Sequence, residues 1–146
     1  MFMRAPVREL RGISLFAGLS DADLAAVAAS CTMRTFEKQS QILGEQEQTT
    51  DLFFILDGTV RATSYTEAGR EVIFNEFHAG EMIGEFSAID GRPRASSVIA
   101  VTDCRLARMT RERMQALRYS NEDVEEVTRL VELHLRFHTY QMGWTD

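Results

Sequence analysis

Three residues close together in the sequence have the chemistry to bind a phosphate ester of a sugar. Gly84 precedes a run, 85–89, that is long enough for one or two helical turns, and Arg94 follows Glu85 by nine residues. Unpaired N–H groups at a helix start, the absent Cβ of Gly84 and a guanidinium fork all favour a bound phosphate. Glu85 would repel that phosphate, so we interpret it as an acceptor for a neutral hydroxyl such as a ribose 2′-OH.

The residues between Glu85 and Arg94 predict a short helix, followed by a backbone of restricted conformation just before the arginine. Asp90 and Gly91 form a turn signal, and Pro93 fixes the backbone just before Arg94. The alternative is a surface hairpin on which the glutamate and the arginine are simply solvated.

Residues 84–89 (GEFSAI) and 92–95 (RPRA) together resemble the phosphate-binding cassette of cyclic-nucleotide-binding domains. This family includes catabolite activator proteins, regulatory subunits of cAMP-dependent protein kinase and the gating domains of cyclic-nucleotide-gated channels. The resemblance implies that Glu85 holds the ribose 2′-OH and that Arg94 pairs with the cyclic phosphate. The ligand-binding residues that it implies are Gly84, Glu85, Phe86, Ser87, Arg94, Ala95 and Ser96, with Thr139 and Tyr140 against the purine.

The resemblance favours cAMP as the ligand. Members that prefer cGMP often carry threonine directly after the cassette arginine, where this chain has Ala95. Ser96 or Ser97 can still serve the guanine amino group, so cGMP stays open as the alternative ligand.

The loop at residues 44–51 (GEQEQTTD) departs from the family pattern. Gln46 and Thr49 stand where relatives commonly carry glycines. If the turn requires a positive φ at those positions, we expect backbone strain or a different turn.

Composition limits the classes of function. A length of 146 residues suits one domain, and 22 acidic against 16 basic residues argue against autonomous DNA binding. No apolar run approaches the roughly 18 residues of a membrane span, and no signal-peptide pattern opens the chain, so we expect a cytoplasmic protein. Cys31 and Cys104 are far apart and are expected to be reduced, buried thiols.

The stretch from Thr32 to Met109 predicts a mainly β structure of about eight short strands separated by turn signals, a sandwich or barrel. The resemblance implies the β-roll or jelly-roll form, an α+β class with an N-terminal helix, the cassette helix and two C-terminal helices. The expected strands are 34–37, 41–43, 52–56, 59–65, 71–77, 97–101 and 104–109, with hairpin turns at 57–58 and 67–69.

Helices are predicted on both sides of the strands, within a single domain over 1–146. Ser20 and Asp23 have capping-box spacing before a helix over 21–30. Thr110 is expected to cap a helix over 111–118. The domain is expected to divide into a helical entry and β-roll over about 13–109, with the cassette at 83–97, and C-terminal helices over 110–142, the longer opened by Ser120 and Asp123.

The longer C-terminal helix carries two apolar stripes, more than it needs to lie on one surface. We expect one stripe to pack on the β-roll and the other on a second copy in a homodimer, the alternative being a single broad core face. The resemblance implies that this helix lies over the nucleotide base, so Tyr140, Phe137 and Trp144 are candidate aromatic lids, or simple packing residues. His134 and His138 have metal-ligand spacing, but without a third ligand we expect no metal.

Taken together, the residues and the family resemblance favour a cAMP-preferring sensor domain that moves its C-terminal helices on binding, with a hinge near 118–121. One alternative is the effector-binding part of a Crp/Fnr-type transcription regulator without its helix-turn-helix. Another is a β-roll interaction protein that no longer binds nucleotide. No hydrolase triad or triphosphate-binding loop stands out, so an enzyme or a cofactor is not expected, and the output partner is not specified.

Overall fold

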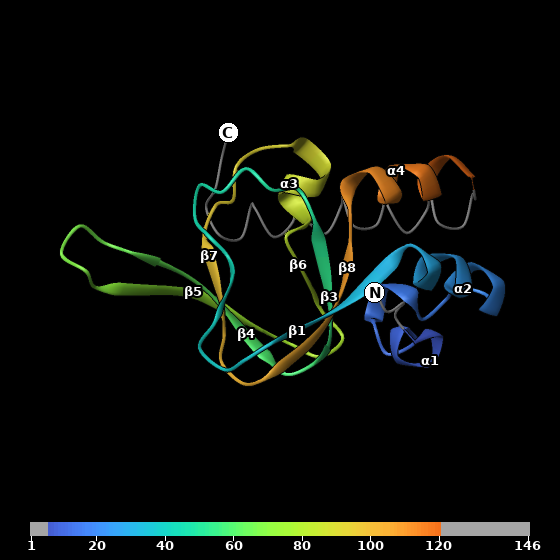
Figure 1. Ribbon diagram of the computed structural model, residues 1–146, viewed down its shortest axis with the longest axis horizontal. Coiled ribbons are helices and arrows are strands. Elements are labelled where there is room, and N and C mark those ends of the chain that lie inside the picture. The colour runs from blue at the N-terminus through green and yellow to red at the C-terminus, as the bar shows by residue number, and fades with distance from the viewer. Residues whose placement is uncertain (1–5, 121–146) are drawn as a thin grey trace.

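Residues 6–120 are described by the structure, a computed structural model, and they form a mainly β domain with short helices (Figure 1). The helices are α1 (Val7–Leu10), α2 (Asp21–Ala29), α3 (Glu85–Asp90) and α4 (Arg111–Ser120), with a 3-10 turn, η1 (Ser14–Phe16). The strands are β1 (Cys31–Phe36), β2 (Gln41–Leu43), β3 (Leu52–Asp57), β4 (Thr59–Tyr65), β5 (Glu71–His78), β6 (Met82–Ile83), β7 (Ser97–Ala100) and β8 (Cys104–Met109).

The strands of this range form two antiparallel four-stranded sheets, in the orders β1-β8-β3-β6 and β2-β7-β4-β5. One apolar cluster joins the two sheets, because Ile55 and Leu106 from the first meet Val60 and Val98 from the second. Ile55, Val60 and Leu106 are fully buried. This is the predicted β-roll, with its core between the sheets.

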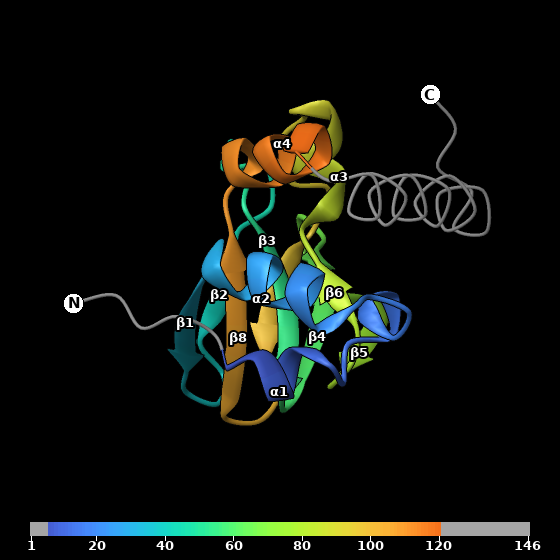
Figure 2. The same cartoon turned by 90° about the vertical axis from the view of Figure 1, so that its right-hand side faces the viewer.

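A second apolar cluster joins the N-terminal helices to the outer side of the first sheet. Phe16 packs edge to face on Phe54 of β3, with ring centroids 4.8 Å apart. Figures 1 and 2 show α1 and α2 against β3 and β8. The predicted cap of α2 is present, since the Asp23 N–H donates to Ser20 Oγ at 3.1 Å, and the helix ends at Ala29.

One predicted hairpin is wrong. The turn at Asp57 and Gly58 connects β3 and β4, but these strands belong to different sheets, so the turn carries the chain across the roll. An Asp-Gly pair signals a tight turn without specifying which strands pair beyond it. The hairpin predicted at 67–69 is correct, because β4 pairs with β5 from Thr59↔His78 to Tyr65↔Glu71. The two-residue β6 was missed because it is too short for its alternation to be read.

Helices α3 and α4 lie at the same end of the roll (Figure 2). The Arg113 N–H donates to Thr110 Oγ1 at 3.2 Å, which confirms the predicted cap of α4. Helix α4 continues to Ser120, two residues past its predicted end. Ser120 is therefore helical and not the cap of a separate helix, and residues 118–120 of the predicted hinge belong to α4. The predicted longer helix, its apolar stripes, His134 and His138 lie outside the described residues.

Cys31 and Cys104 are both buried and free, as predicted. Within residues 6–120, no helix combines the length and the apolar character that crossing a membrane requires.

The crossover at Gly58 generates a stability prediction. Gly58 has φ 103°, and an added Cβ would lie 2.6 Å from the Asp103 carbonyl oxygen and 2.7 Å from Cys104 Sγ. Gly58→Ala should therefore lower the free energy of unfolding by about 3 kcal/mol, measured by urea denaturation. Gly69→Ala is the matched control, because Gly69 has φ 79° but open space around it, so only about 1 kcal/mol of backbone strain is expected. Equal losses in the two variants would contradict the proposed steric origin.

Candidate functional site

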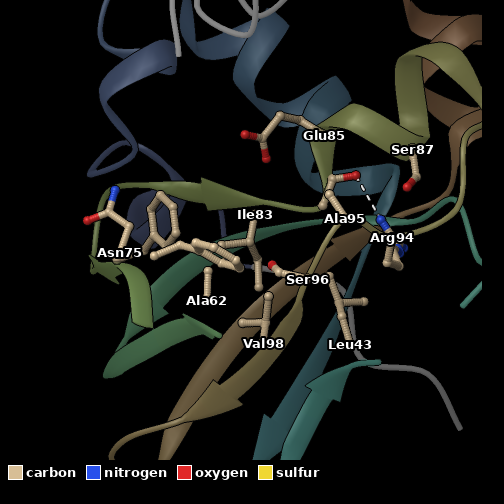
Figure 3. A pocket seen from close by; sticks show the side chains of 13 residues that line it. Leu43, Ala62, Asn75, Ile83, Glu85, Ser87, Arg94, Ala95, Ser96 and Val98 are labelled. Carbon is tan, nitrogen blue, oxygen red and sulfur yellow. Dashed lines mark hydrogen bonds between the residues drawn. The ribbon is translucent and has the colours of Figure 1, made fainter. Parts of the chain in front are cut away.

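A hollow of about 580 Å³, its open mouth included, lies beside α3 and opens over the second sheet. Figure 3 shows Arg94, Ser87 and Glu85 gathered at the α3 end, with Asn75 and Ala62 at the other end. The complete lining is Leu43, Ala62, Phe74, Asn75, Phe77, Ile83, Gly84, Glu85, Ser87, Arg94, Ala95, Ser96 and Val98.

The backbone at the start of α3 accepts only glycine without strain. Gly84 has φ 81°, and an added Cβ would lie 2.7 Å from the Asp51 carbonyl oxygen and 3.0 Å from Arg94 Nη1. The helix ends as predicted, since Gly91 caps α3 with φ 73°. These two glycines define a six-residue helix inserted between β6 and β7.

The Arg94 side chain is buried beneath this helix, with 3% of the residue exposed. Its Nε donates to Thr49 Oγ1 at 3.2 Å, Nη1 to the Gly84 carbonyl at 2.9 Å (dashed in Figure 3) and Nη2 to the Asp51 carbonyl at 2.8 Å. Guanidinium carries five N–H donors. With the described residues as partners, one N–H on each terminal nitrogen is left for a ligand.

Burial lowers the pKa of Arg94, and the nearby carboxylates of Asp51, Glu47 and Glu85 act in the opposite direction. The guanidinium remains protonated, because an arginine is not deprotonated in proteins. The acceptors of its three hydrogen bonds are uncharged oxygens. The α3 end of the hollow therefore has a cation whose charge is only partly compensated.

The loop between β2 and β3 holds the backbone of Arg94. The Arg94 N–H donates to the Glu47 carbonyl at 2.8 Å, and the Gln46 N–H donates to the Arg94 carbonyl at 2.9 Å. Gln46 has φ 67°, so the strain expected at this position is present. Thr49 is not among the residues with positive φ, so the strain expected there is absent.

Glu85 is buried at the first position of α3, with 5% of the residue exposed. Its Oε2 has no hydrogen-bond partner among the described residues. Burial raises the pKa of Glu85 to about 7, although a hydrogen bond from its own backbone N–H and the charge of Arg94 oppose the shift. In Figure 3 its carboxyl is turned away from the Arg94 guanidinium, and the two residues form no ion pair although both line the hollow.

The structure brings most of the predicted site residues to one hollow. Its lining includes the predicted Gly84, Glu85, Ser87, Arg94, Ala95 and Ser96. Phe86 belongs to α3, but its side chain is not described, and Thr139, Tyr140, Phe137 and Trp144 lie outside the described residues.

Several lining residues were not predicted. Phe74, Asn75 and Phe77 come from β5, Ala62 comes from β4, which pairs with β5, and Val98 comes from β7, which pairs with β4. Strand alternation marks two faces but does not say which one borders a hollow, so no sequence signal identified them. His78 lies at the end of β5 and pairs with Thr59 Oγ1 at 3.2 Å, away from the lining. Residues 6–120 contain no cluster of metal-ligand side chains.

A β-roll interrupted by a short helix, with an arginine and a carboxyl buried at one hollow, defines a domain organised around a small ligand. The sequence profile of the cyclic nucleotide-binding domain matches residues 33–121, more than half of the chain. The chain belongs to this family, and the resemblance of its cassette to that family is confirmed.

The relatives are regulatory proteins. The cAMP-activated global transcriptional regulator CRP of Salmonella typhimurium is 26% identical over 106 residues, which cover 72% of this chain and 50% of the regulator. The cAMP-dependent protein kinase regulatory subunit of Mycosarcoma maydis is 27% identical over 91 residues, covering 62% of this chain and 17% of that protein. The solved catabolite activator protein of Thermus thermophilus aligns with TM-score 0.76 and 25% identity over 88% of this chain and 61% of that chain. The chain thus spans about half the length of the CRP it matches.

The buried carboxyl generates a pH-dependent prediction. Because the folded pKa of Glu85, about 7, lies above its ordinary value of 4.5, the folded state holds a proton that the unfolded chain has lost. The stability that this proton provides is complete below about pH 4.5 and is lost as pH rises through 7. Between pH 5.5 and 8 the wild type should lose about 2 kcal/mol more than Glu85→Gln, measured by urea denaturation.

The control for this measurement is Glu67→Gln, a change at an exposed glutamate on the β4–β5 turn. Glu67→Gln should follow the pH dependence of the wild type. If Glu85→Gln followed it too, the carboxyl of Glu85 would not have the raised pKa.

Proposed function

We propose that this chain is a sensor domain that binds a cyclic nucleotide, with a preference for cAMP, in the hollow beside α3. The observation that carries the proposal is the pair formed by a buried, partly compensated cation and a buried carboxyl oxygen without a partner at the same hollow. A cyclic nucleotide has an anionic phosphate for Arg94 and a neutral 2′-OH for Glu85. Family membership and the similarity to cAMP-named regulators support the same ligand class.

The chemistry assigns a role to each end of the hollow. The two remaining N–H groups of Arg94 donate to the two exocyclic oxygens of the phosphate, in the bidentate manner that suits guanidinium. The Glu85 carboxylate accepts from the ribose hydroxyl, which provides the partner that Oε2 lacks in the described residues. Phe74 and Phe77 offer apolar surface for the base.

The choice of base depends on the residues that follow the cassette arginine. Ala95 has no hydroxyl to donate or accept, which supports adenine over guanine. Ser97 Oγ accepts from the Glu45 N–H at 3.0 Å and does not line the hollow. Ser96 does line it, so it is the residue through which guanine would be accommodated.

Movement of the C-terminal helices forms the second half of the proposal. Arg111 of α4 lies against the end of α3, so close that a Cβ on Gly91 would be 2.9 Å from Arg111 Nη1. Met114 and Leu117 of α4 also pack on the cluster that contains Ala88 of α3. A phosphate that draws α3 toward Arg94 would therefore displace α4. The ligand shifts this equilibrium only as far as it prefers one arrangement of the two helices.

The CRP relatives support a related reading in which the chain is the effector-binding part of a transcription regulator. In that reading the moving helices pass the signal to a DNA-binding part, and residues 121–142 contribute a contact between two copies. Both readings require the same ligand site.

Arg94→Ala should weaken cAMP binding at least tenfold, because it removes two charge-assisted hydrogen bonds to the phosphate. Calorimetric titration with cAMP and with cGMP measures the effect and the base preference together. Arg92→Ala is the matched control, since Arg92 belongs to the same cassette but is 63% exposed and does not line the hollow. The control should bind within about twofold of wild type. Unchanged affinity in Arg94→Ala would contradict the site, and tighter binding of cGMP would contradict the base preference.

Trp144 offers a direct test of helix movement, because it is the single tryptophan of the chain and lies in the C-terminal segment. Saturating cAMP should change the intensity or the wavelength of its fluorescence emission, since the environment of the indole changes when the segment is repositioned. Arg94→Ala should show no change at the same concentration. Constant emission in a wild-type sample that calorimetry shows to be saturated would argue against repositioning of this segment.

A further inference from the structure

Thr49 makes a contact with the anion site that no family pattern supplied. It lies in the loop between β2 and β3, and its Oγ1 accepts from Arg94 Nε at 3.2 Å. The other two acceptors of the guanidinium are the main-chain carbonyls of Gly84 and Asp51. Of the three acceptors that the guanidinium has within residues 6–120, the one from a side chain is therefore the Thr49 hydroxyl.

The loop that carries Thr49 is fixed to Arg94 by its main chain as well. Arg94 exchanges backbone hydrogen bonds with Glu47 and Gln46. At the far end of the loop, the Asp51 carboxylate pairs with Arg108 Nε at 2.6 Å. Threonine is β-branched, so a fixed backbone limits its hydroxyl to few positions, and the one present here meets Arg94 Nε.

The two hydrogen bonds at the terminal nitrogens of Arg94 leave the guanidinium plane free to tilt. The hydrogen bond at Nε removes this freedom. The guanidinium is planar, so holding Nε in addition to Nη1 and Nη2 sets the tilt of the plane. That tilt decides where the two remaining N–H groups point. A cyclic phosphate has two exocyclic oxygens, and a planar fork binds both only when its plane contains them.

We infer that Thr49 is a positioning residue for the anion site, setting the plane of the Arg94 guanidinium through its bond to Nε. This inference rests on the proposed function and deepens it by naming the residue that orients the phosphate-binding group. Thr49 does not line the hollow and is not assigned a contact with the ligand.

The test compares Thr49→Val with Thr49→Ser. Valine keeps the shape and the β-branching but removes the acceptor, whereas serine keeps the hydroxyl. Thr49→Val should weaken cAMP binding by about three- to tenfold, and Thr49→Ser should stay within about twofold of wild type. Calorimetry gives the affinities, and melting of each variant without ligand shows whether the fold is intact.

A second readout distinguishes orientation from general support of the fold. The two phosphorothioate diastereomers of cAMP each replace one exocyclic oxygen with sulfur. If Thr49 sets the plane of the fork, Thr49→Val should change the ratio of the affinities for the two diastereomers. A purely structural role would weaken both equally and leave that ratio at its wild-type value.

The outcomes separate this inference from the proposed function. If the wild type binds cAMP and Thr49→Val has the same affinity and the same diastereomer ratio as the wild type, the inference is overturned and the proposed function stands. A wild-type chain that binds neither cAMP nor cGMP overturns the proposed function and the inference with it. If Thr49→Val melts well below wild type, Thr49→Ala replaces it in the same comparison with serine, and the same criteria apply.

Discussion

The burial of one cation is the constraint on which the rest of this site depends. Arg94 is almost completely removed from solvent, and a buried charge must be hydrogen-bonded. The fold meets this requirement with carbonyl and hydroxyl oxygens, which pair the donors without neutralising the charge. Glu85, whose pKa burial has raised, does not neutralise it either. The roll therefore carries a positive charge at its hollow that a bound anion can balance.

This constraint explains why the helix interrupts the β structure where it does. Gly84 is both the last residue before α3 and an acceptor for Arg94, so the helix start and the arginine are placed by one contact. The absence of a Cβ at Gly84 permits the guanidinium and the Asp51 carbonyl to approach together. The loop between β2 and β3 then closes the other side. Gly84, Arg94 and the loop between β2 and β3, which are separate in the sequence, thus form one hydrogen-bonded polar cluster beside the apolar core.

The sequence was sufficient to predict the parts of this unit whose chemistry is local. Gly84, Glu85 and Arg94 are recognisable because glycine, carboxylate and guanidinium at this spacing have few other uses, and strands such as β4 and β8 follow from their apolar patterns. It was not sufficient for contacts that depend on sheet pairing. The Asp57 and Gly58 turn was assigned to a hairpin because local turn chemistry does not determine the partner strand. For Thr49 the sequence suggested only a possible backbone strain, whereas the contact that matters is the hydrogen bond from Arg94 Nε to its hydroxyl.

The crossover at Gly58 also bears on how the chain folds. Since β3 and β4 separate into different sheets, β3 finds its partners in β6 and in β8, and β1 pairs with β8 from Cys31↔Met109 to Phe36↔Cys104. The first sheet cannot form until residues some 70 positions apart have met, and closing so long a loop costs entropy before any pairing compensates it. Folding should therefore be slow for a domain of this length. A growing chain on the ribosome would leave β1 and β3 without β8 until almost all of the described residues had been synthesised.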